Sequence, residues 1–324
     1  MFTLNKKNLL IGIVLLGLVV FPFTPGAVDS YAFSFLFTVF IYALLAQSWN
    51  FVAGYAGQVS LGQHAFFGLG AFTTAILWSR NLIWGARYDA DPTAYYFDPV
   101  TMFLSGLVPA ILSVVIGVAL LNKLRGDYFA LGTLGLGEIV RTLFINGKEL
   151  TGGAFGVVVP SSVFETMMPH YWVGLALVVG TTLALHFTIK SRFGLAFIAV
   201  RDDEMAASAN GVNTLFFKTL AFAAGAFVAG LAGSLYTFSV FFISPNAIFG
   251  LDWLLIPLMM VVVGGTGTVT GPIVGALVMY TIFDVAKIYV PDFHPIISGL
   301  TIILVMLFMP KGVMNLKFRG IMKS

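Results

Sequence analysis

Long runs of apolar residues alternate along this chain with short polar or charged segments. A helix of about 20 apolar residues is long enough to cross the hydrocarbon core of a bilayer. The runs predict ten membrane-spanning helices, at Leu9–Pro25, Tyr31–Asn50, Leu61–Arg80, Pro99–Asn122, Tyr128–Asn146, His170–Ile189, Lys218–Phe242, Asp252–Gly265, Gly271–Val290 and Pro295–Pro310. The eighth and tenth are short for simple spans, so irregular backbone or shielding by neighbouring helices is expected there. The predicted fold class is an all-α polytopic membrane bundle.

The basic residues are distributed unevenly among the segments that join these helices. Lysine and arginine are enriched on the cytoplasmic side of membrane proteins. With the N-terminus inside, the inner segments hold 12 of the 17 basic residues: Lys6, Lys7, Lys123, Arg125, Lys190, Arg192, Arg201, Lys218, Lys311, Lys317, Arg319 and Lys323. Both termini are therefore expected in the cytoplasm. The first apolar run has no cleavage site of the A-x-A type after it, so we expect an uncleaved anchor helix.

The composition supports a membrane location and removes several classes of function. Hydrophobic residues make up 59% of the 324 residues and charged residues only 10%, whereas soluble proteins carry about 25% charged residues. The chain has no cysteine, which excludes disulfides, thiolate metal sites and a cysteine nucleophile. A net charge of +3 does not suggest nucleic-acid binding. No linker or change of composition divides residues 1–324, so a single domain is expected.

The longest inner segment, Lys190 to Thr214, contains a helix signal outside the membrane. Three acidic residues, Asp202, Asp203 and Glu204, favour a helix start by capping and by their interaction with the macrodipole. Good helix formers follow, and Gly211 is placed as a C-terminal stop. The sequence predicts a short cytoplasmic helix within 202–211 whose surface carries small residues, Ala206, Ala207 and Ala209. Such a helix suits the groove of a partner protein, and a self-contained turn on the membrane surface is the alternative.

Polar side chains within the spans are candidates for function because they are costly in lipid. Glu138 and Arg141 lie three residues apart, hence on one helix face, where they can pair. The pair either fixes the packing of the bundle or lines or gates a pathway. A polar cluster lies where the second span ends and the third begins: Gln47, Asn50, Gln58, Ser60, Gln63 and His64. Glycines break helical regularity there, which suits a cavity lining, and close helix packing explains these glycines equally well.

Five motifs are spread over most of the chain. They are QSWNFVAGYAGQVSLGQHAF at 47–66, RGDYFA at 125–130 continuing to TLGLGEIVR at 133–141, LTGG at 150–153 with Gly156, the segment Gly194 to Asn213, and GGTGT at 264–268 with Gly271-Pro272. Together they resemble the membrane subunits of branched-chain (hydrophobic) amino-acid ABC importers, specifically the Liv-type permease of the M kind.

The resemblance implies a heteromeric importer in the bacterial inner membrane. Its other members would be a second permease of the H kind, two cytoplasmic ATPase subunits and an external substrate-binding protein. The segment 202–211 is similar to the coupling helix that sits in an ATPase groove, with one inserted residue. This implies ATPase contacts at Arg201, Asp202, Asp203, Glu204, Ala207 and Gly211. Branched-chain or other hydrophobic amino acids are the implied cargo, and urea or a short amide is the alternative.

The chain itself is not expected to be an enzyme or to bind a cofactor. Its glycine-rich segment Gly264–Gly271 lacks the Gly-Lys-Ser/Thr ending that holds phosphate and Mg²⁺, so ATP and Mg²⁺ are expected on the partner ATPases. No spacing unites His64 with the other histidines, so no metal site is predicted. The competing class is an ion-coupled secondary transporter with Glu138 or Asp284 as proton carrier. That class is typically built from inverted repeats, and none is visible in the chain.

Overall fold

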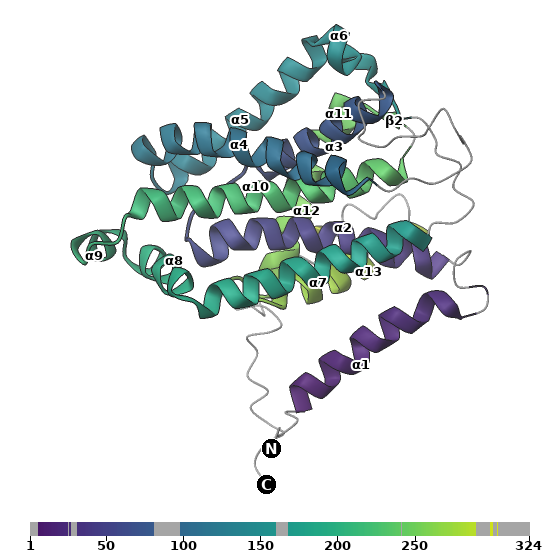
Figure 1. Cartoon of the computed structure of the whole chain (residues 1–324), viewed down its shortest axis with the longest axis horizontal. Helices are drawn as coiled ribbons and strands as arrows, with labels where there is room; N and C mark the ends of the chain where they lie inside the picture. Colours follow the sequence, from purple (N-terminus) through teal and green to yellow (C-terminus); the bar gives the residue numbers. More distant parts are fainter. Residues whose placement is uncertain are drawn as a thin grey trace.

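The structure, a computed structural model, describes residues 6–24, 26, 31–80, 98–159, 168–240, 242–289, 299, 300 and 303. Within these ranges the chain is a bundle of helices with one antiparallel pairing of two short strands (Figure 1). The longer helices are α1 (Lys6–Val20), α2 (Tyr31–Trp49), α3 (Gln63–Ser79), α4 (Pro99–Lys123), α5 (Asp127–Asn146), α7 (Met168–Lys190), α8 (Arg192–Asp202), α10 (Thr214–Ser239), α12 (Asp252–Gly264) and α13 (Gly271–Tyr289). The shorter elements are η1 (Phe21–Phe23), the π-helix η2 (Asn50–Tyr55), α6 (Lys148–Thr151), η3 (Gly153–Phe155), β1 (Val157–Val158), α9 (Glu204–Ala209), β2 (Phe242–Ile243) and α11 (Pro245–Ile248).

Seven helical segments of the described residues are long and apolar enough to cross a membrane. They are Tyr31–Tyr55, Pro99–Lys123, Asp127–Asn146, Met168–Lys190, Thr214–Ser239, Pro245–Gly264 and Gly271–Tyr289. The chain is therefore an all-α polytopic membrane protein, as predicted. α3 is shorter, with 17 residues, and most of it is buried in the bundle. The predicted tenth span and the two chain ends lie almost entirely outside the described residues, so the count of ten spans and the placement of the termini stay predictions.

Two spans extend five or more residues beyond a predicted end, each for a local reason. The second does not stop at Asn50 but continues through η2 to Tyr55. The eighth is longer than predicted because α11 leads into α12, which gives a 20-residue span from Pro245 to Gly264. The eighth span looked short in the sequence because Gly250 separates α11 from α12, and only α12 was counted.

The helix α10 is the centre of the bundle and packs against α2, α3 and α4. Gly70 of α3 meets the backbone of Gly230 on α10, and a Cβ on Gly230 would overlap the backbone of α4. Three buried hydroxyls, of Thr74, Ser105 and Ser234, join the same three helices through hydrogen bonds of 2.7 Å. Small and hydroxyl residues serve this purpose in lipid, where close packing and hydrogen bonds replace the hydrophobic force between helices.

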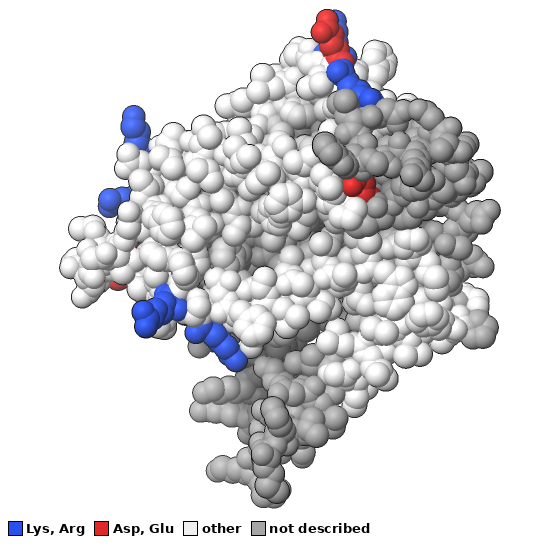
Figure 2. Space-filling model, viewed as in Figure 1, with Lys and Arg blue, Asp and Glu red and all other residues white. Residues whose placement is uncertain are grey.

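On the face of the bundle that Figure 2 shows, charged side chains gather towards the two ends and leave a broad uncharged band between them. One end carries Lys123, Arg125, Lys190 and Arg192, at the boundaries of α4, α5, α7 and α8. The helices α8 and α9 lie at this end, on the left of Figure 1. We call it the basic end, and we call the opposite end the distal end.

Candidate functional site

The helix α2 is broken near the basic end. Its last turn is the π-helix η2, and Gly57 directly after it has a left-handed φ of +69°. A Cβ on Gly57 would lie 2.8 Å from Cγ of Arg201, so glycine is needed for both the backbone conformation and the contact. Single π-helical turns inside helices frequently mark functional sites. We call residues 50–62 the broken segment.

A second irregular stretch, the loop between α12 and α13, lies beside the broken segment. Gly265 and Gly267 in this loop have φ values of +117° and +72°. Asn50 holds the loop by two hydrogen bonds: its Oδ1 accepts from the Gly267 N–H at 2.8 Å, and its Nδ2 donates to the Thr268 carbonyl at 2.9 Å. Asn50 is fully buried. The predicted irregularity at Gly264–Gly271 is thus present, and a polar residue of another span stabilises it.

Arg201, at the end of α8, connects both irregular stretches to the helices at the basic end. Its Nη1 donates to the Gly54 carbonyl at 3.1 Å, and the same nitrogen lies 3.3 Å from the place of a Cβ on Gly267. Its Nη2 lies 2.9 Å from Oδ1 of Asp202, which is 62% exposed. We call the place where Arg201, the broken segment and the α12–α13 loop meet the junction.

The predicted helix within 202–211 is present as α9, and the structure adds a helix before it. Asp203 is the N-cap of α9 and accepts hydrogen bonds from two backbone N–H groups of the first turn. Gly211 follows the helix with a φ of +82°, as expected for a C-terminal stop. The helix α8 was not predicted, although Ser191 is a signal for it, since the Ser191 hydroxyl caps that helix. We call α8 and α9 together the hairpin.

The two faces of α9 differ in exposure. Ala207 is 5% exposed and packs within the chain, whereas Met205 is 69% exposed and Ala206 and Ala209 are also exposed. A partner protein would therefore meet the outward face first. Contacts of Arg201, Asp202, Asp203, Glu204, Ala207 and Gly211 with an ATPase stay a prediction.

An ion pair between Glu204 and Lys218 attaches α9 to α10. The side chain of Lys218 is 2% exposed and that of Glu204 is 29% exposed. Lys218 was expected to be one of the basic residues at the cytoplasmic surface, but it is buried. A lysine inside the first turns of an apolar helix was the signal for such a pair, because a buried amine requires a partner.

Other members of the predicted polar cluster hold helices together. Ser48 donates to the Gly225 carbonyl of α10 at 2.8 Å and lies 3.2 Å from Oε1 of Gln63. His64 is fully buried, with its imidazole against Gly137 of α5. The Gln63 Nε2 and both His64 nitrogens find no hydrogen-bond partner among the described residues. The cluster is therefore distributed over several helix contacts.

The far end of the broken segment is attached to α5. The Leu61 N–H donates to Oγ1 of Thr133 at 2.9 Å, and a Cβ on Gly62 would lie 2.8 Å from the Thr133 carbonyl oxygen. Gln58 instead bonds within its own segment, donating to the Ala56 carbonyl at 3.3 Å. The broken segment therefore links the junction to α5.

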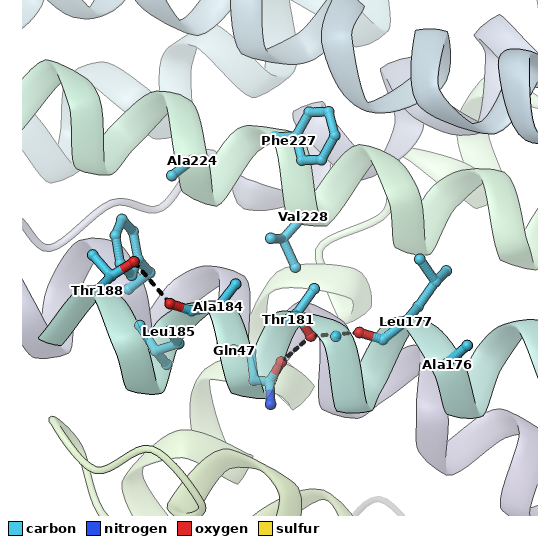
Figure 3. Close-up of a pocket in the computed structure, with 12 residues that line it drawn as sticks. Gln47, Ala176, Leu177, Thr181, Ala184, Leu185, Thr188, Ala224, Phe227 and Val228 are labelled. Atoms are coloured by element: carbon cyan, nitrogen blue, oxygen red, sulfur yellow. Dashed lines mark hydrogen bonds between the residues drawn. The ribbon is translucent and has the colours of Figure 1, made fainter. Parts of the chain in front are cut away.

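Gln47 lies in a groove of about 520 Å³ between α2, α7 and α10 (Figure 3). Its Oε1 accepts from the Thr181 hydroxyl and its Nε2 donates to the Thr182 hydroxyl, both at 2.6 Å. Most of the other lining residues are apolar: Phe51, Ala176, Leu177, Gly180, Ala184, Leu185, Ala224, Phe227 and Val228. Both ends of the Gln47 amide are thus bound to α7, and the groove is a largely apolar surface.

The predicted pair of Glu138 and Arg141 is present on α5. Arg141 Nη1 lies 3.1 Å from Glu138 Oε2, and Arg141 Nη2 donates to Oδ1 of Asn246 on α11 at 3.0 Å. The side chains of Arg141 and Glu138 are 35% and 47% exposed. The pair therefore lies on the surface of this chain, within a membrane-spanning helix.

Comparisons with known proteins agree with this architecture. The family model of the permease component of branched-chain amino acid transport systems matches residues 31–306. The high-affinity branched-chain amino acid transport system permease protein LivM of Salmonella typhimurium is 28% identical, over 96% of this chain and 76% of the relative. The probable LivM of Methanocaldococcus jannaschii is 23% identical, over 84% and 90%. The autoinducer 2 import system permease protein LsrC of Salmonella choleraesuis is 28% identical, over 88% and 81%.

No solved structure matches the chain. The family match covers most of the residues, and the described helices give the multi-pass membrane architecture that a permease requires. This chain belongs to the family of branched-chain amino acid transport system permease components, and it is a multi-pass protein of the bacterial inner membrane.

Proposed function

We propose that this chain is one of two membrane subunits of an ATP-driven ABC importer that carries branched-chain or other hydrophobic amino acids into the cytoplasm. Family membership supports the permease role. The single observation that carries the ATP-driven part is the hairpin, which is attached by Arg201 to the irregular backbone of two spans. A permease without its own ATP site depends on such an attachment, because a change in an ATPase can reach the spans only through contacts.

The proposed assembly contains a second permease of the H kind, two cytoplasmic ATPase subunits and an external substrate-binding protein. ATP and Mg²⁺ bind to the ATPases, and this chain carries no cofactor. In the proposed topology the chain is a single domain with ten spans, and both termini lie in the cytoplasm. The basic residues at the end that holds the hairpin support this orientation.

The cargo is the narrower part of the proposal. The names of the LivM relatives refer to branched-chain amino acids, and that of the LsrC relative refers to autoinducer 2. Apolar spans suit the side chains of leucine, isoleucine and valine. A conducting site must also release what it binds, so we expect selection by the external protein and no saturable high-affinity binding to the isolated permease.

Purification from the native membrane in mild detergent tests the assembly. We expect a second permease and an ATPase pair to co-purify, and the reconstituted complex with its binding protein to take up leucine only when ATP is supplied. A homo-oligomer that takes up solute with an ion gradient and no ATP would contradict the proposal. Uptake assays with the native binding protein test the cargo, because uptake of urea or autoinducer 2 there would replace amino acids as the substrate. Exchange of the binding protein tests whether that protein selects the cargo.

The outward face of α9 gives a sharper test of the ATPase contact. Ala206→Cys should cross-link to an ATPase subunit, and Asn146→Cys, at the distal end of α5, should not. Ala206→Arg should abolish most ATP-driven uptake and leave Tm unchanged, because Ala206 is exposed. Ala207→Arg should lower Tm, because Ala207 is buried. Normal uptake by Ala206→Arg, without any cross-link at 206, would contradict the contact.

A further inference from the structure

The charged pair on α5 is partly exposed far from either end of the helix. α5 runs from Asp127 to Asn146, and at a rise of 1.5 Å per residue Glu138 lies about 17 Å from its first residue and about 12 Å from its last. At this depth an exposed side chain would meet lipid unless something else covers it. Charged side chains in spans almost always face a bundle interior or a water-filled cavity. The charged pair therefore favours a partner or a water-filled cavity over lipid on this face of α5.

The residues beside the pair form one stripe along α5. Tyr128, Leu131, Gly135, Glu138 and Thr142 recur at alternating steps of three and four residues, which places them on one face of the helix. All five are exposed or partly exposed, with Tyr128 at 74% and Leu131 at 62%. A Cβ on Gly135 would meet no atom of the described residues within 4 Å. Gly135, about one helical turn from Glu138, therefore has no described neighbour in front of it. We call these five residues the α5 stripe.

Other outward surfaces have a different character. α4 exposes large apolar side chains, among them Phe103, Ile111 and Val115 at 55%, 55% and 66%, as suits contact with lipid. α5 also exposes Ile139 and Leu143, at 60% and 64%, and differs from α4 in its charged pair. The groove beside α7 has one amide, that of Gln47, and both of its ends are bonded to threonines. α5 and α7 lie on opposite sides of α10 in Figure 1. The depth of its charges therefore distinguishes the side that carries the α5 stripe, since Asp284 and Lys287 of α13 lie within five residues of the end of their helix.

We propose that the α5 stripe lines a water-filled translocation pathway, and that Glu138 and Arg141 form a weak contact site in it for the zwitterionic end of an amino acid. The second permease closes this pathway, so the inference rests on the proposed function. An ammonium group donates to the Glu138 carboxylate, and a substrate carboxylate accepts from the Arg141 guanidinium. Gly135 leaves room for the substrate side chain. The substrate competes with the existing Glu138–Arg141 pair, which keeps its binding weak and its release fast.

Thiol labelling tests the pathway, since the chain has no native cysteine. Gly135→Cys and Thr142→Cys are compared with Ile111→Cys and Val115→Cys of α4, all in the co-purified complex in proteoliposomes. A charged, membrane-impermeant thiol reagent reacts with the thiolate, which lipid disfavours, so we expect the α5 positions to react at least about tenfold faster than the α4 positions. Equal rates at the four positions would overturn the assignment to a pathway. The labelling needs neither ATP nor cargo, so its failure leaves ATP-driven uptake intact, whereas a wild-type complex without ATP-driven uptake refutes the proposed function.

Uptake kinetics test the contact site. Glu138→Gln and Arg141→Gln should each raise the KM for leucine severalfold at an unchanged Tm. Glu149→Gln, which removes an exposed carboxylate of α6 outside the stripe, is the control and should retain the wild-type KM. A lowered Tm with an unchanged KM would overturn the contact site and assign the pair to the packing of α5 against α11.

Discussion

Asn50 satisfies both a donor and an acceptor of a loop that bends through two left-handed glycines. An alanine at this position leaves a partly buried N–H and a partly buried carbonyl without partners, and each such group costs up to roughly 1–3 kcal/mol. We expect Asn50→Ala to lower the free energy of unfolding by roughly 2–4 kcal/mol, measured as a lower Tm of the detergent-purified protein. The matched control is Gln58→Ala, because the Gln58 amide makes a longer bond to one carbonyl of its own segment. Equal Tm values for the two variants would show that the loop does not depend on Asn50.

Lys218 is a buried charge whose partner belongs to the hairpin. Removing the carboxylate charge by Glu204→Gln leaves the amine without a charged partner in a poor solvent, and Lys218→Met strands the carboxylate; breaking a buried pair in this way costs roughly 3–5 kcal/mol. The double variant Glu204→Gln with Lys218→Met removes both charges, and we expect it to regain most of the lost stability. Thermal unfolding of the two single variants and the double variant measures the coupling. Additive losses would mean that the pair does not stabilise the contact between α9 and α10.

At the scale of the helices, packing in this bundle depends on where backbones approach one another. Gly230 is enclosed by α3 and α4, whereas a Cβ on Gly180 of α7 would meet no described atom within 4 Å. Gly230→Ala should therefore lower the free energy of unfolding by roughly 1–3 kcal/mol through overpacking. Gly180→Ala, the matched control, should be neutral or stabilising by up to about 1 kcal/mol, because alanine is the better helix former. The Tm values of the two variants test this, and a tolerated Gly230→Ala would refute the close contact.

The sequence predicts some elements better than others for physical reasons. Long apolar runs determine α4 and α7, because a span is fixed by its length and its hydrophobicity alone. The glycines between Asn50 and His64 indicated irregular backbone there, but they did not predict that residues 50–55 form a π-helix. The α8 helix was missed because its apolar residues are too few for a span and its cap lies next to the end of α7. The bond from Asn50 to Gly267 joins residues 217 positions apart, and no single sequence contains a signal for that pairing.

At the scale of the whole molecule, two of the polar contacts that attach the hairpin have different consequences. Glu204 and Lys218 attach it to the packed centre of the bundle, and Arg201 attaches it to the broken segment. The first attachment holds the hairpin in place. The second is positioned to transmit its movement, because the broken segment continues to Thr133 on α5.

Arg201→Ala should therefore lower the amount of leucine taken up per ATP hydrolysed and leave the assembled complex intact. Arg201→Lys should recover part of this ratio. A lysine ammonium can donate to the Gly54 carbonyl, but it lacks the planar guanidinium group that also contacts Asp202. The control is Arg192→Ala, which removes an exposed arginine from the first turn of the same helix. Uptake and hydrolysis are measured together in proteoliposomes. A ratio unchanged by Arg201→Ala would exclude this route of transmission.

The short strand pairing at the distal end has a mechanical consequence for α5. β1, which follows α5 through η3, pairs with β2 after α10, with Val157 opposite Ile243. At the basic end α5 follows a short link in which Gly126 has a φ of +53°. The strand pairing therefore ties the distal end of α5 to the bundle, and a tilt of the helix would pivot about that end. A helix of 20 residues is about 30 Å long, so a tilt of about 10° about its distal end moves its basic end by about 5 Å. In the proposed importer, a pull through the broken segment would thus open the pathway at the basic end before the distal end, which is the order that release on the ATPase side requires.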